Sequence, residues 1–150
     1  MATNYLRLRF ADDHDGTGLL MARAEADGFA GEGEAYFDIP SLQDFAAAIA
    51  LFPLPKDDER LSISGGFGAS SEQEHLGISI YAADRQRGYI GVQVRMATKV
   101  WQDTRPMSRK AAVIEVVTTY EPLARFSKDL AAMLRGELRE ATLKGEEWTR

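Results

Sequence analysis

Apolar and polar residues alternate with a period of two over several segments of this chain. The clearest case is residues 89–100, where Ile90, Val92, Val94 and Met96 share one side. This period is typical of strands that have two different faces. The alternation and the turn residues around it predict strands at 5–10, 19–26, 28–39, 60–65, 76–83, 89–100 and 110–120.

Two other segments repeat apolar residues at i, i+3, i+7 and i+10, which is the buried stripe of an amphipathic helix. The stripes are Leu42, Phe45, Ile49 and Phe52, then, 81 residues later, Leu123, Phe126, Leu130 and Met133. Each helix begins beside a proline, with Ser41 as the expected N-cap of the first. Pro53 and Pro55 end the first helix, and the second is predicted to run toward Arg139.

The two matched segments have two explanations. One is a diverged duplication of a β-β-α unit, with the copies at 17–52 and 89–134. The other is convergence, because two helices that pack on one sheet need the same apolar stripe. The sequence leaves both open.

Short turns such as Asp27-Gly28 join neighbouring strands as hairpins, and they leave no room for a parallel crossover. We therefore predict an α+β fold, with one mostly antiparallel sheet of about six to seven strands. The two helices would cover one face of that sheet. Residues 1–150 would form a single domain, in which residues 140–150 are a polar tail.

Composition narrows the class of protein. The chain has 45% hydrophobic and 27% charged residues, as in globular proteins, and it has no cysteine for a disulfide or thiolate site. Neither a signal sequence nor a membrane-length apolar run is found, so we expect a cytoplasmic protein. The net charge of -5 argues against nucleic acid as a partner.

Positive charge is nevertheless concentrated in one stretch. Residues 84–110 hold seven basic side chains against Asp84 and Asp103. The loop within this stretch adds side chains that are enriched at protein interfaces. The predicted binding residues are Arg95, Lys99, Trp101, Arg105, Met107 and Arg109. In the alternative interpretation the loop is structural and Trp101 folds back over the core edge.

The sheet face opposite the apolar one is expected to carry charged and polar side chains that a partner can contact. These are Arg7, Arg9, Arg23, Glu25, Glu32, Glu34, Gln93, Arg95, Lys99 and Glu115. An antiparallel sheet can leave one face in water. A solvated face without a partner explains the same pattern.

Candidate catalytic and metal motifs are incomplete. Residues 12–16 lack the end ligands of a calcium loop, and residues 64–75 lack the lysine and the helix of a phosphate loop. Glu32 and Glu34 are spaced for paired carboxylate chemistry but lie on a polar strand face. We predict no catalytic residue, no metal site and no cofactor. The alternative is a small-ligand or hydrolytic site near His75, Glu32 and Glu34.

The order of these features resembles small bacterial proteins of unknown function and the related WapI-family immunity proteins. The matching stretches are FAGEGEAYFDIPSLQDFAAAIALF and VIEVVTTYEPLARFSKDLAAML. The resemblance implies a cytoplasmic protein that binds and neutralises a toxin, and it carries no site residue.

These observations favour a non-enzymatic protein-binding module, immunity-like in its role. Its basic loop and charged sheet face would bind another protein with an acidic surface. We expect neither nucleic acid nor a membrane as a partner, and the sequence leaves a homo-oligomer open.

Overall fold

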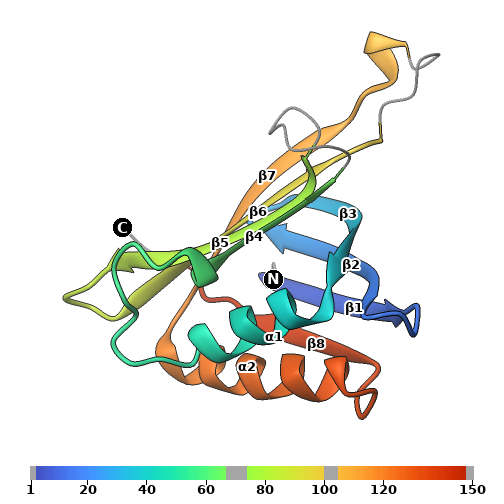
Figure 1. Cartoon of the computed structure of the whole chain (residues 1–150). Coiled ribbons are helices and arrows are strands. Elements are labelled where there is room, and N and C mark those ends of the chain that lie inside the picture. Colours follow the sequence, from blue (N-terminus) through green and yellow to red (C-terminus); the bar gives the residue numbers. More distant parts are fainter. Residues whose placement is uncertain (1–2, 67–73, 100–104, 148–150) are drawn as a thin grey trace.

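The computed structural model describes residues 3–66, 74–99 and 105–147 (Figure 1). The first half of the chain contains β1 (Tyr5–Asp12), β2 (Thr17–Ala26), β3 (Phe29–Asp38), α1 (Ile39–Ala48), the short 3-10 helix η1 (Glu59–Leu61) and β4 (Ser62–Gly66). The second half contains β5 (Glu74–Asp84), β6 (Tyr89–Ala97), the 3-10 helix η3 (Pro106–Ser108), β7 (Ala111–Thr118), α2 (Tyr120–Leu134) and β8 (Glu140–Lys144).

The strands of the described residues form two four-stranded antiparallel sheets. Sheet A has the order β3-β2-β1-β8, and sheet B has the order β4-β5-β6-β7. The α+β class and the antiparallel pairing are confirmed, whereas the prediction of one sheet of six to seven strands is wrong. Hairpin turns determine only which sequence neighbours pair. They carry no information on the step from β3 to β4, and at this step the chain changes sheets.

Strand β3 joins the two sheets, because it crosses the inner face of sheet B and contacts all four of its strands. Gly31 lies over β7, where an added Cβ would be 2.9 Å from the Cβ of Ala112. A Cβ on Gly33 would lie 2.8 Å from Cγ of Met96 on β6. At the far end of β3, the ring of Phe37 packs against Gly65 of β4. The alternating glycines of β3 are therefore sites of close backbone approach.

Both helices fill the space that opens between the sheets beyond this crossing, and Figure 1 shows them side by side. Phe45 and Phe126 are buried in the same core cluster, together with residues of both sheets. The hydroxyl of Ser127 donates a 2.6 Å hydrogen bond to the carbonyl oxygen of Ala46, so the helices touch at positions 81 residues apart. The duplication itself stays a prediction.

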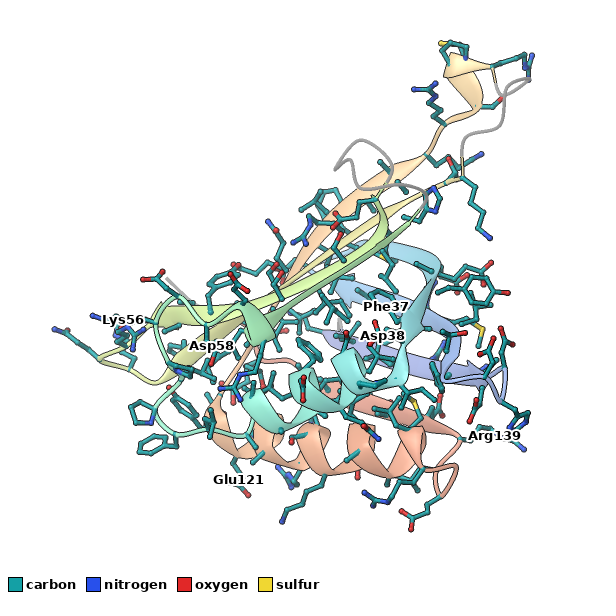
Figure 2. All side chains as sticks on the ribbon, in the orientation of Figure 1. Phe37, Asp38, Lys56, Asp58, Glu121 and Arg139 are labelled. Atoms are coloured by element: carbon teal, nitrogen blue, oxygen red, sulfur yellow. The ribbon has the colours of Figure 1, made fainter. Side chains whose placement is uncertain are left out.

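Helix α1 begins differently from the prediction. Asp38, not Ser41, is its N-cap, and the Asp38 carboxylate accepts hydrogen bonds from the amide and hydroxyl of Ser41. These hydrogen bonds lower the pKa of Asp38. Figure 2 shows Phe37 and Asp38 at the point where β3 passes into α1. One residue is buried and the next caps the helix because neighbouring strand residues face opposite ways.

The apolar stripe of α1 is shorter than predicted. Its last predicted member, Phe52, is 78% exposed and lies beyond the helix, with its ring edge against Tyr120. A proline inside a helix clashes with the carbonyl four residues earlier and disfavours helical geometry in the residue before it. Pro53 thus excludes Phe52 from the helix, and Leu54 is the buried residue instead.

The C-terminal region corrects two further predictions. α2 ends at Leu134, and residues 140–144, assigned to a polar tail, form the strand β8, which pairs with β1 at an edge of sheet A. Ala141 and Leu143 alternate into the core. Only two apolar residues mark this short strand. Their alternation is too brief to distinguish from a charged tail without its partner strand.

The close approach at Gly33 predicts a large effect of a β-branched residue. Gly33→Val is expected to lower the free energy of unfolding by about 1–3 kcal/mol or more, because the new atoms overlap Met96 and the His75 carbonyl. Urea denaturation measures this loss. Ala30→Val adds the same side chain to an exposed position of β3, where a change within about 0.5 kcal/mol is expected. An equal loss of unfolding free energy in the two variants would contradict the close packing of β3 on sheet B.

Candidate functional site

The described ends of β6 and β7 continue past the rest of sheet B as a projecting arm, which we define as residues 96–99 and 105–112. Thr98 holds the two sides together, because its amide donates to the Lys110 carbonyl at 2.9 Å and its hydroxyl accepts from the Lys110 amide at 3.0 Å. Figure 1 shows the arm extending away from both helices, with η3 at its end. Several of the predicted binding residues therefore stand clear of the core.

The arm tip, residues 105–109, exposes the side chains that the loop was predicted to present. Met107 is 94% exposed, and Arg105 and Arg109 flank it, also exposed. Within the tip, Arg105 makes a 3.3 Å hydrogen bond to the hydroxyl of Ser108. Trp101 lies outside the described residues.

Arg95 is placed differently from the tip residues. It lies on the outer face of sheet B, where its guanidinium bonds Glu74 at 2.8 Å and the side chains of Ser79 and Gln93 at 2.9 Å. Burial raises the pKa of Glu74, but hydrogen bonds from Arg95 and Ser64 and the charge of Arg95 outweigh it, so the net pKa is lowered. Arg95 is therefore held by hydrogen bonds within sheet B and does not lie on the arm tip.

A groove of about 900 Å³ lies between the outer face of sheet A and the base of the arm. Arg7, Arg9 and Arg23 line it from β1 and β2, and Lys99 and Lys110 line it from the arm. Two carboxylates, Glu32 and Glu34, complete its charged lining. The lining holds five basic and two acidic side chains, and Glu25 and Glu140 also pair with its arginines, which leaves a small excess of positive charge in a protein of net charge -5.

The arginines of the groove are held by a network across sheet A. Arg7 and Arg9 share one carboxylate, that of Glu140 on β8, at 3.6 and 3.2 Å. Arg23 bonds Glu32 at 3.2 Å and the hydroxyl of Tyr5 at 2.8 Å. Exposed pairs of this kind contribute about 0–1 kcal/mol each. They orient the guanidinium groups while leaving them able to exchange partners.

The predicted charged face is divided between the two sheets. Arg7, Arg9, Arg23 and the glutamates of β3 lie on sheet A, whereas Gln93, Arg95 and Glu115 lie on sheet B. The expectation of one continuous face is wrong, because it assumed one sheet. The structure instead joins the sheet A part to Lys99 and Lys110 of the arm.

Four residues of this groove were not among the six predicted binding residues. Arg7, Arg9 and Arg23 were assigned to the charged sheet face that a partner was expected to contact, and Lys110 was assigned only to the basic stretch. Alternation and local charge were the available signals. Neither of these sequence features predicts that the base of the arm lies beside sheet A.

In the alternative site, His75 and the two glutamates lie on different faces of β3. The two glutamates project from the outward face of β3, whereas the backbone of His75 lies beneath the inward face at Gly33. His75 is buried, and this burial, followed by the charge of Lys99, lowers its pKa. His75 is not among the residues that line the groove with Glu32 and Glu34, and the alternative site stays a prediction.

The described residues contain no group of three or more His, Asp or Glu side chains placed to hold a metal ion. In the turn between β1 and β2, the carboxylates serve the backbone instead. Asp12 accepts from the amide of His14 at 2.7 Å, and Asp15 accepts from the amide of Thr17 at 3.0 Å. This segment acts as a hairpin turn.

No protein-family model, curated protein or solved structure matches this chain. Neither helix within the described ranges has the length and apolar character needed to cross a membrane.

Substitution of Arg95 should lower the stability of the protein, whereas substitution of a tip arginine should not. Arg95→Met is expected to lower the free energy of unfolding by about 1–3 kcal/mol at pH 7, because it removes charged hydrogen bonds to Glu74. The pKa of Glu74 is lower in the folded protein than in the unfolded chain, where it is about 4.3. Glu74 therefore stabilises the fold above that pKa, and this stabilisation is lost as pH falls through the pKa of the folded protein. The deficit should therefore shrink below about pH 4.

Thermal and urea unfolding from pH 7 to pH 3 measure this dependence. Arg105→Met is the matched control, since among the described residues Arg105 bonds only within the tip, and its unfolding curve should overlay that of the natural protein. A deficit for Arg95→Met that stays constant with pH would show that the Glu74 pair is not its source.

Proposed function

We propose that this protein is a non-enzymatic binding module that captures an acidic surface of another protein. The observation that carries the proposal is the meeting of two chain-distant basic groups at one groove: Arg7, Arg9 and Arg23 from sheet A, and Lys99 and Lys110 from the arm. An acidic protein that concentrates positive charge in one groove favours partners of opposite sign there. Such complementarity mainly accelerates encounter and selects the partner.

The arm tip extends the proposed surface. Met107 supplies an exposed flexible apolar side chain, and Arg105 and Arg109 supply forked donors for carboxylates. A projecting hairpin can reach a partner while the groove at its base holds a second part of it. Loops on a rigid scaffold commonly carry function in this way.

Three features support protein over other ligands. The groove is open and wide, unlike an enclosed pocket for a small molecule. Glu32 and Glu34 in its lining, with the net charge of -5, disfavour a phosphate backbone. His75 and these glutamates do not converge, which favours binding over hydrolysis. Neutralisation of a toxin, as the resemblance implies, would be one instance of this function.

Charge reversal in the groove tests the proposal. The double variant Lys99→Glu and Lys110→Glu is expected to weaken partner binding at least about tenfold, with a smaller dependence on salt, because it reverses the attraction at the arm base. The partner is first recovered by affinity capture from the native host and identified by mass spectrometry. Binding of the purified pair is then measured by calorimetry.

The matched control is the double variant Lys56→Glu and Lys128→Glu, which makes the same charge change at exposed positions outside the groove. Figure 2 shows Lys56 well away from the arm. The proposal predicts unchanged binding for this control. It is wrong if both double variants weaken binding equally, or if the natural protein retains a small molecule and no stoichiometric protein.

A further inference from the structure

The outer edge of β7 is open in the described structure. β7 is the last strand of sheet B, so among the described residues no strand is hydrogen-bonded to one of its two sides, although β2 and β3 of sheet A cross over it. The Lys110 carbonyl bonds Thr98 across the pair with β6, so the backbone groups of Lys110, and of every second residue after it, face β6. The backbone N–H and C=O groups of Ala111, Val113, Glu115 and Val117 therefore face the open side.

A second hydrogen bond confirms this direction. The amide of Glu146 donates to the Val117 carbonyl at 2.7 Å, from the side opposite to β6. The chain after β8 thus covers the C-terminal end of the edge. The open part of the edge consists of Ala111, Val113 and Glu115. The side chains of these three residues are also exposed.

The hairpin of β2 and β3 overhangs this open edge. Residues 31, 33, 35 and 37 of β3 point onto sheet B, and Phe29 continues the same row one position beyond Gly31, which lies over β7. Phe29 is 74% exposed, as expected of a side chain that points past the last strand of the sheet. The place beneath Phe29 is where a fifth strand of sheet B would lie.

Space and apolar surface accompany the open edge. A cleft of about 850 Å³ runs along it and is lined by Phe29, Tyr81, Val113 and Val117. Val113 is 65% exposed. At the other end of the edge, Ala111 and Ala112 line the basic groove, with Ala30 of the hairpin on the opposite side.

The charges along this path have a direction. Lys99 and Lys110 lie at the end nearest Ala111, whereas Asp27 and Glu115 line the cleft at the other end. A strand added antiparallel to β7 would place its C-terminal half beside the lysines and its N-terminal half beside the carboxylates.

We propose that the partner supplies an extended peptide segment that adds to the open edge of β7 as a fifth, antiparallel strand of sheet B. This inference rests on the proposed function and specifies the partner: the segment is acidic in its C-terminal half and apolar at its centre. Its backbone pairs with Ala111, Val113 and Glu115, and its central side chains pack under Phe29. Strand addition of this kind takes affinity from the backbone and specificity from the side chains.

Proline at Val113 tests the backbone pairing directly. The Val113 amide faces away from β6, so Val113→Pro removes a donor of the open edge without removing a ladder bond to β6. Val113→Thr keeps the amide and a β-branched side chain, and it is the matched control. Ala111→Pro, at the first residue of β7, is the second variant if Val113→Pro does not fold.

The probe is a display library of random decapeptides selected on the natural protein. We expect enriched peptides with Asp or Glu in the C-terminal half, bound equally by Val113→Thr and at least about tenfold more weakly by the proline variant. Hydrogen exchange followed by NMR should show slowed amides at Ala111, Val113 and Glu115 when such a peptide is bound.

Other outcomes overturn the inference in distinguishable ways. The proline variant could bind the peptide normally while the Lys99→Glu, Lys110→Glu variant does not. This result would support the basic groove as the binding site and contradict strand addition. If the library yields no enriched peptide while the host protein is still captured, the proposed function stands and the strand does not. A dimer of the natural protein that Val113→Pro converts to monomer would assign the edge to a second copy of this chain.

Discussion

The packing of β3 across sheet B is the constraint on which the rest of the structure depends. Gly31 and Gly33 allow the two backbones to approach so closely that a Cβ on either would meet the opposing sheet. The inward-facing residues of β3 increase in size along the strand, from Gly31 and Gly33 through Ala35 to Phe37. The sheets are therefore closest at one end of β3 and separate toward the other, where α1 and α2 complete the core.

The same crossing positions the proposed binding surfaces. Because β3 passes over sheet B, its outward residues Glu32 and Glu34 and the neighbouring arginines of sheet A lie beside the base of the arm. Its first residues extend past β7, which leaves Phe29 above an open edge. A structural requirement for small residues in the middle of one strand thus has consequences at both of its ends.

Arginines of the same basic stretch have different environments in this fold. Arg95 lies in the outer face of sheet B, where its guanidinium makes hydrogen bonds to Glu74, Ser79 and Gln93. Arg105 lies on the arm tip, where it makes a hydrogen bond to Ser108. The difference follows from position: a residue inside a sheet has cross-strand neighbours on the same face, and a residue at a hairpin tip does not.

Local pattern alone determined most elements of this protein. Alternation located the first seven strands, the stripes of Leu42 and Leu123 located both helices, and residues 84–110 were recognised as basic, because each of these properties is set within a few neighbouring residues. The tertiary structure decided that the strands divide into two sheets and that residues 140–144 pair with β1. It also decided that Lys99 and Lys110 meet Arg7, Arg9 and Arg23. These outcomes depend on which distant surfaces pack together, and spacing along the chain does not specify how closely two backbones approach in space.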